Sequence, residues 1–193
     1  MRNDSPFAKL TKRCALFTSL LCALLILLHS LFEHSVILSL AITAGTTAYH
    51  VVMRLSVGWL VTLSTRGQLP SDHFWFRQRP FERRLYRILR VRKWKGKMPT
   101  YDPGKFSFAQ NTPEQIIQNS CEAELVHEII AVASFLPLLA SFLWGAFPVF
   151  LISSILAAAL DCCFAIMQRY NRPRIIKLIK RYEKGVGSSE KSL

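Results

Sequence analysis

Residues 14–53 set the fold class of the chain, and they read CALFTSLLCALLILLHSLFEHSVILSLAITAGTTAYHVVM. Glu33 is the only Asp, Glu, Lys or Arg among them. A helix that spans a membrane needs roughly 20 mostly apolar residues. The pattern therefore predicts two spans, 14–32 and 35–53, joined at the polar corner Glu33–His34. A cleaved signal peptide is the alternative for the first span, but its apolar part exceeds the usual ~7–15 residues and a second span follows.

A second apolar region, 129–160, also lacks Asp, Glu, Lys and Arg. It is too long for one span, and residues 144–148 supply turn formers in its middle. We therefore predict spans near 129–143 and 148–168, the first kinked by Pro137. Together the two regions predict an all-α integral membrane bundle of about four transmembrane helices.

Charge is distributed unevenly along the chain. There are 25 Lys and Arg against 12 Asp and Glu, a net charge of +13. Four basic residues precede the first span, twelve lie between Arg66 and Lys105, and eight lie from Arg169 onward, while the two hairpin corners hold none. Because Lys and Arg concentrate in cytoplasmic loops, both termini and the central segment are predicted to be cytoplasmic. This topology accounts for the positive charge, and no nucleic-acid recognition motif is present, so we expect no nucleic acid partner.

The chain divides into three predicted parts: an N-terminal transmembrane hairpin, 1–54, a membrane-embedded region, 55–184, and a flexible tail, 185–193. The apolar piece 55–63 is too short to span alone and either extends the second helix past Arg54 or lies at the interface. The five cysteines match neither a disulfide framework nor a zinc pattern.

Two basic segments predict cytoplasmic amphipathic helices. Between 77 and 97 there are ten Lys and Arg and one acid, while Leu85, Ile88 and Leu89 recur at i, i+3 and i+4. Such a helix suits the headgroup layer, and membrane adhesion alone is the simplest interpretation. Pro173 predicts that the fourth span ends or kinks about two residues before it, with a second basic helix beyond.

Polar residues gather where the third span begins. Thr112 resembles an N-cap followed by proline, so a helix is expected to start there. Further along, Glu124, His127 and Glu128 stand at i, i+3 and i+4 and share a helix face. A carboxylate that orients an imidazole raises its basicity, as a general base requires. The alternatives are a wet helix end and a metal site, but the Glu-x-x-His pair of bundle metal sites occurs once here.

Asp161 interrupts the fourth apolar run, where a charge costs about 2.5–3.5 kcal/mol on insertion scales. It must pair with a cation near the helix end, such as Arg169, or have a functional role. The corner around Asn171 holds Arg172 and Arg174. Arginine forks suit phosphate, and an asparagine amide can donate to a developing oxyanion.

Three segments carry a resemblance to a known family: Val91–Lys95 followed by Met98-Pro99, Ala123–His127 followed by Pro137, and Gln168–Arg174, which reads QRYNRPR. In this order and spacing they resemble the glycosyl-4,4'-diaponeurosporenoate acyltransferases, small bacterial membrane proteins of staphyloxanthin-type carotenoid synthesis. The resemblance implies a multi-pass protein of the bacterial cell membrane. It also implies transfer of a fatty acyl group, from a thioester donor such as acyl-CoA, to a sugar hydroxyl of a glycosylated carotenoid or similar lipid.

We therefore hypothesise an active site at the cytoplasmic leaflet, where a charged donor and an amphiphilic acceptor meet. The expected catalytic residues are His127 as base, Glu124 as its orienting group, and Asn171 and Arg172 as oxyanion donors. No cofactor beyond the acyl donor and no metal is expected, and the oligomeric state is open. The alternatives are a non-catalytic lipid-binding subunit and another lipid-modifying enzyme, a methyltransferase or reductase. The expected substrate-binding residues are Arg92, Lys93, Trp94, Lys95, Glu128, Asp161, Arg169, Tyr170 and Arg174.

Overall fold

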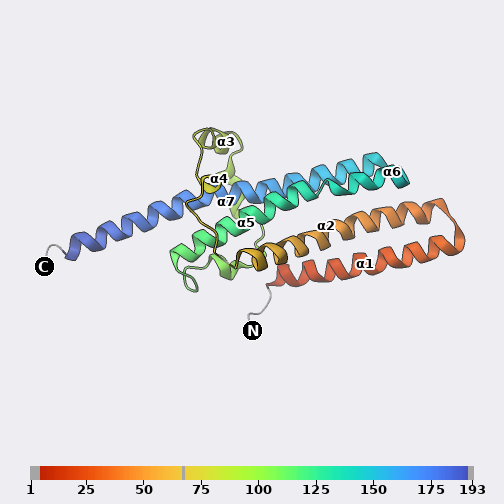
Figure 1. Ribbon diagram of the computed structural model, residues 1–193, viewed down its shortest axis with the longest axis horizontal. Coiled ribbons are helices and arrows are strands. Elements are labelled where there is room, and N and C mark those ends of the chain that lie inside the picture. Colours follow the sequence, from red (N-terminus) through yellow and green to blue (C-terminus); the bar gives the residue numbers. More distant parts are fainter. Residues whose placement is uncertain (1–4, 67, 191–193) are drawn as a thin grey trace.

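The computed structural model describes residues 5–66 and 68–190, with side chains as far as residue 181. All regular structure in these described residues is helical, which confirms the all-α prediction. Two long helical hairpins lie side by side along the molecule, and both turn at the same end (Figure 1).

The first hairpin consists of α1 (Pro6–Phe32) and α2 (Ser35–Thr65). The predicted corner is confirmed, because Glu33 ends α1 in the left-handed conformation with φ 49°. Small residues allow the two helices to approach closely, as in other membrane helix pairs. At Gly45, an added Cβ would lie 3.1 Å from the Cys22 Sγ. The other small residues buried in these two helices include Ala8, Ala15, Ala41, Ala44 and Ala48.

The apolar piece 55–63 extends the second helix, since α2 continues without a break to Thr65. Arg54 therefore lies inside a long helix, and α2 crosses the predicted boundary between residues 54 and 55. The three-part division itself stays a prediction, and the last residues of the predicted tail, 191–193, lie outside the described residues.

The second hairpin begins with α5 (Pro113–Ala133), whose predicted N-cap is confirmed by a capping box between Thr112 and Gln115. The 3₁₀ segment η4 (Leu136–Ala140) and α6 (Ser141–Trp144) follow. The α-helical hydrogen-bond pattern is interrupted here because Pro137 has no N–H to donate to the carbonyl of Ala133. Tyr49 of α2 donates to that carbonyl instead, at 2.8 Å.

The return helix, α7 (Phe147–Glu190), starts after a turn in which Gly145 and Ala146 have positive φ, as the turn residues predicted. Of the two alternatives for the residues near Asn171, an end or a kink of the helix, the end with a separate basic helix beyond is wrong, because Pro173 lies inside α7. Tertiary contacts hold the helix before the proline, because Tyr170 and Arg172 are both buried.

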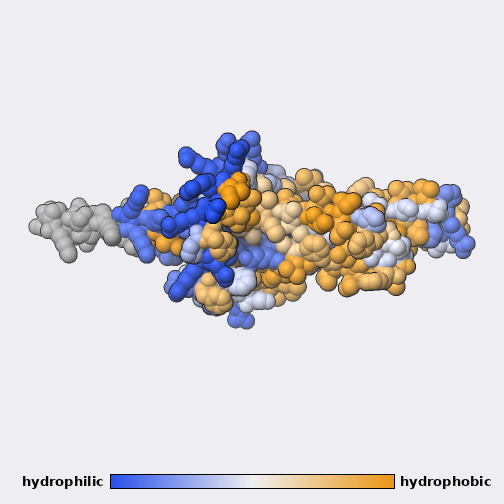
Figure 2. All heavy atoms as spheres, turned by 90° about the horizontal axis from the view of Figure 1, so that it is seen from above, coloured by the Kyte–Doolittle hydropathy of each residue, from blue (hydrophilic) through white to orange (hydrophobic). Residues whose placement is uncertain are grey.

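Four helical stretches are long and apolar enough to cross a membrane, in agreement with the predicted spans. They cover Pro6–Phe32, Ser35–Thr65, Pro113–Trp144 and Phe147–Arg181. Large apolar side chains on them are exposed; Leu16 and Leu156 are 63% and 66% exposed. Apolar residues cover one half of the molecule and hydrophilic residues the other, apart from a polar patch at the far tip (Figure 2). This is the surface expected of a protein that places its apolar half in lipid.

The segment between the hairpins packs on the hydrophilic half as short helices. They are η1 (Phe74–Phe76), α3 (Glu82–Ile88), α4 (Val91–Trp94), η2 (Lys95–Lys97) and η3 (Pro103–Phe106). In α3 the residues buried against the protein are Glu82 and Tyr86, whereas Ile88 and Leu89 of the predicted apolar stripe are exposed. A role for these short helices at the membrane surface stays a prediction.

Candidate functional site

A buried carboxylate joins α5 to α7. Glu124 is fully buried, and its two oxygens accept hydrogen bonds from Arg172 Nη2 and, at 2.6 Å, from Arg169 Nη1. Arg172 is itself only 2% exposed. Since an isolated charge is very costly to bury, these groups compensate one another.

The same two arginines hold the short helices in place. Arg169 Nη2 lies 2.8 Å from Glu82 Oε1 and also donates to the backbone carbonyl of Arg77, while its Nη1 donates to the carbonyl of Trp75. Arg172 donates to the carbonyl of Phe76 at 3.0 Å. These bonds attach η1 and α3 to the core formed by α5 and α7.

Tyr86 completes this network by donating its hydroxyl to Glu82 Oε2 at 2.6 Å. Burial and this hydrogen bond raise the pKa of Tyr86 well above its ordinary value. The Tyr86 and Tyr170 rings pack in a T-shaped arrangement, with ring centroids 5.4 Å apart. The two tyrosines therefore fix α3 against α7 at a defined point.

A second polar cluster lies among the long apolar helices and contains His127. Its Nδ1 is 2.9 Å from Asp161 Oδ1, and its ring stacks on Phe164 with centroids 4.7 Å apart. The other Asp161 oxygen accepts a hydrogen bond from Arg54 of α2, which also donates to the His50 carbonyl. Among the described residues no group of three or more His, Cys, Asp and Glu could hold a metal ion.

This geometry corrects one expectation. Glu124 does not orient His127, because both of its oxygens are bound by Arg169 and Arg172. For Asp161 the sequence left two alternatives open, a pair with an arginine near the helix end or a substrate-binding role; in the structure it binds Arg54 and is the carboxylate that holds the imidazole. A carboxylate at Nδ1 leaves Nε2 as the atom that can take a proton. The histidine side chain is 23% exposed and so remains accessible.

Glu128, predicted to bind substrate, faces the short helices. Its Oε2 accepts a hydrogen bond from the Trp75 indole at 2.8 Å, and its Oε1 lies 3.8 Å from Arg169. Arg172, expected as an oxyanion donor, points its guanidinium at Glu124 and backbone carbonyls. Both side chains therefore contact groups within the protein in this structure, and Arg172 is buried in doing so.

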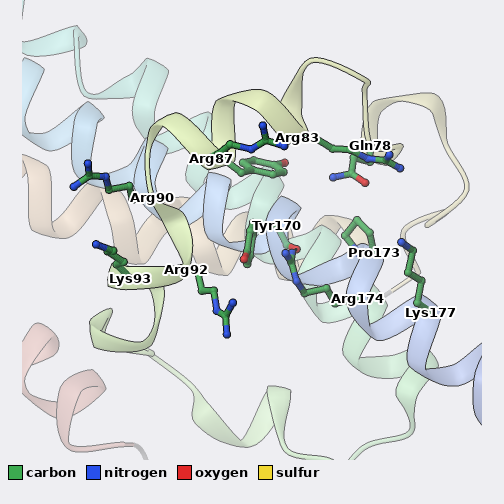
Figure 3. Close-up of a pocket in the computed structure, with 11 residues that line it drawn as sticks. Gln78, Arg83, Arg87, Arg90, Arg92, Lys93, Tyr170, Pro173, Arg174 and Lys177 are labelled. Atoms are coloured by element: carbon green, nitrogen blue, oxygen red, sulfur yellow. The ribbon is translucent and has the colours of Figure 1, made fainter.

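A cleft of about 520 Å³ opens between α3, α4 and α7. Tyr86 and Tyr170 lie in its wall, and cations from both sides surround it (Figure 3). Among the described residues that line it, seven are basic and none is acidic. The basic residues are Arg83, Arg87, Arg90, Arg92, Lys93, Arg174 and Lys177.

The rest of the predicted substrate-binding set lies around Tyr170. Arg174 stacks on the Tyr170 ring at 3.4 Å, and Lys95 Nζ lies 5.0 Å from the same ring. Lys95 Nζ also donates to Asn171 Oδ1 at 2.6 Å. Burial, together with Arg174 and Arg92, lowers the pKa of Lys95. Trp94 instead donates its indole N–H to the Leu89 carbonyl, 2.9 Å away.

The structure does not bring Asn171 into contact with His127. Asn171 lies seven residues beyond Phe164, which stacks on the histidine. Seven residues are two turns along one helix face, about 10 Å. The imidazole, the Lys95–Asn171 pair and the basic cleft therefore follow one another along α7, and an oxyanion role for Asn171 stays a prediction.

The short helices, α5 and the part of α7 that form these sites lie in the region that a family comparison matches. Residues 72–181, more than half of the chain, match the family described as glycosyl-4,4'-diaponeurosporenoate acyltransferase. The chain belongs to this family. Membership implies an acyltransferase of carotenoid biosynthesis. No curated protein and no solved structure matches the chain.

Sequence reasoning missed several residues of the site. Arg54, which binds Asp161, lies outside the segment that the family covers. The sequence could have indicated Arg54, because it is the single Lys or Arg between Cys14 and Thr65. Glu82, the single acid among ten basic residues between 77 and 97, gave a similar signal and binds Arg169. Phe164 had no distinguishing pattern in its apolar run.

Proposed function

We propose that the protein transfers a fatty acyl group from a thioester donor to a sugar hydroxyl of a glycosylated carotenoid or a similar membrane lipid. The observation that carries the proposal is the pairing of His127 with Asp161, together with family membership. Asp161 fixes the ring and stabilises the imidazolium that forms when Nε2 accepts a proton. Arg54 compensates the carboxylate from its other side.

In the proposed reaction, His127 Nε2 removes the proton of the acceptor hydroxyl while its oxygen attacks the thioester carbonyl carbon. The tetrahedral intermediate collapses with cleavage of the carbon–sulfur bond. The leaving thiolate takes the proton back from the imidazolium, so the products are an ester and a thiol.

The proposal places the reaction at the cytoplasmic leaflet of a bacterial cell membrane, with both termini on that side. The distribution of basic residues supports this orientation. His127 belongs to α5, which is mostly apolar beyond this point, whereas the cleft next to α7 is basic. A lipid-soluble acceptor can thus approach from the bilayer and a charged donor from the aqueous side.

The test is acyl transfer by the purified full chain in lipid nanodiscs, with labelled acyl thioester and glycosylated carotenoid, read out by mass spectrometry. We expect a product heavier by one acyl chain. His127→Gln should lower the rate about 10²–10⁴-fold, the usual contribution of a general base. His29→Gln, at the far hairpin corner, is the matched control and should stay within about twofold. A His127→Gln protein that is folded and retains the normal rate would overturn the assignment, as would absence of any acylated product.

A further inference from the structure

We propose that the basic cleft between α3, α4 and α7 binds the phosphates of a nucleotide-bearing thioester donor of the coenzyme A type. The inference rests on the proposed function in one respect: the ligand is an acyl donor only if the protein transfers acyl groups. The site is separate from the His127–Asp161 pair and is carried by its own observations.

The charge of the cleft indicates a polyanion. Seven basic side chains surround a space of about 520 Å³, and no acid is among its described lining residues. A single phosphate is neutralised by one or two arginine forks. A ligand with several phosphates uses cations on both sides of the cleft, those of α3 and α4 and those of α7.

The shape of the cleft favours a nucleotide-sized ligand over a lipid surface. Small-molecule sites usually occupy about 300–1,000 Å³ and are concave. A segment that adheres to anionic lipid requires only an exposed basic face. Here the cations line a hollow between separate helices, with Arg90 and Lys93 on one side of Tyr170 and Arg174 and Lys177 on the other (Figure 3).

Part of the cleft is held in place before any ligand arrives. Arg174 lies 3.4 Å from the Tyr170 ring centroid, and Tyr170 is only 7% exposed because Tyr86 packs against it. A stacked guanidinium loses less side-chain freedom on binding than a free one does, which favours binding. The backbone of Arg90, which has a left-handed φ of 49°, sets its position at the junction of α3 and α4.

The position of the cleft suits a donor whose reactive carbonyl lies far from its phosphates. Along α7 the cleft residues Tyr170 and Arg174 flank Asn171, which pairs with Lys95, and Phe164, on which His127 stacks, lies seven residues before Asn171. The pantetheine arm of a coenzyme A thioester separates its phosphates from the acyl group. Phosphates in the cleft therefore let the acyl group extend toward the imidazole.

The experiment is calorimetric titration of the full chain, in phosphatidylcholine nanodiscs, with free coenzyme A, which has no acyl chain to insert into lipid. The test variant is Arg90→Gln with Lys93→Gln. The matched control is Lys180→Gln with Arg181→Gln, which removes two exposed charges of α7 outside the cleft. Each lost charged contact should weaken binding about tenfold. We expect a loss of about 100-fold in the test variant and less than about threefold in the control.

Two further arms identify the source of the phosphate. Inorganic phosphate should bind at least about 100-fold more weakly than coenzyme A. Coenzyme A should still bind in nanodiscs that contain phosphatidylglycerol. No binding of coenzyme A, equal weakening in both variants, or loss of binding in anionic nanodiscs would each overturn the inference. Acyl transfer from another thioester without coenzyme A binding would contradict this inference but not the proposed function. Coenzyme A binding without acyl transfer would contradict the proposed function but not the binding of coenzyme A in the cleft.

Discussion

Replacing Glu124 by glutamine tests whether the buried ion pairs hold the short helices on the bundle. The carboxylate is fully buried and receives one guanidinium on each oxygen. In Glu124→Gln one carboxylate oxygen is replaced by an amide NH₂ group, which donates hydrogen bonds and cannot accept them. The arginine that faces this group therefore loses its hydrogen-bond acceptor, and both arginines lose the negative charge. Arg169 keeps Glu82 at 2.8 Å, whereas Arg172, 2% exposed, has no other carboxylate bound to it among the described residues.

The magnitude follows from leaving Arg172 as an uncompensated buried charge. Removing one partner of a buried pair costs about 3–5 kcal/mol. Folded domains are stable by only about 5–15 kcal/mol, so this is a large share. Glu128→Gln is the matched control. Its carboxylate is 29% exposed and 3.8 Å from Arg169, so about 1 kcal/mol or less is expected.

The assay is reversible unfolding of the chain in mixed micelles with increasing dodecyl sulfate, followed by far-ultraviolet circular dichroism. The double variant Glu124→Gln, Arg172→Met completes the cycle. Because it removes both charges, it should recover at least about 2 kcal/mol relative to the sum of the single changes. A Glu124→Gln protein within about 1 kcal/mol of the native chain, or strictly additive effects, would refute the reasoning.

Three other predictions use the same unfolding assay. Arg54→Met leaves Asp161 without its guanidinium among apolar helices and should cost about 3 kcal/mol, whereas Arg54→Lys should cost less; equal losses would contradict an ionic role. Because the pKa of Tyr86 is raised above its unfolded value of about 10, its stabilising contribution is full below pH 10 and is lost as pH rises from 10 toward the native pKa. The stability difference between the native chain and Tyr86→Phe should therefore shrink above pH 10, and a constant difference would be inconsistent with this. Gly45→Leu should cost about 1–3 kcal/mol because its Cβ already meets the neighbouring helix at 3.1 Å, while Gly58→Leu, with no atom within 4 Å of its Cβ, should be near neutral.

The long helices were predictable because their signals are local. Apolar runs of sufficient length, the corner at Glu33 and the turn at Gly145 each depend on residues close together in the chain. The N-cap at Thr112 is equally local, since its partner Gln115 is three residues away. Such features need no knowledge of which helices pack together.

The site was only partly predictable because its pairings are not local. Glu124 and His127 share a helix face, yet each is bound by a different part of α7, Glu124 by Arg169 and Arg172 and His127 by Asp161. Spacing within one helix shows which groups point the same way. The partner is determined by the register of the neighbouring helix, and no pattern within one segment contains that register.

The pairing of Arg54 with Asp161 has a consequence for how the protein enters its membrane during synthesis. Without a partner, α7 would carry an unpaired acid into lipid at a cost of about 2.5–3.5 kcal/mol. Arg54 is synthesised 107 residues earlier, as part of α2. If the helices insert in the order of the sequence, Asp161 can pair with Arg54 of α2 as α7 enters the membrane. This pairing lowers the free-energy barrier to assembling the helical bundle.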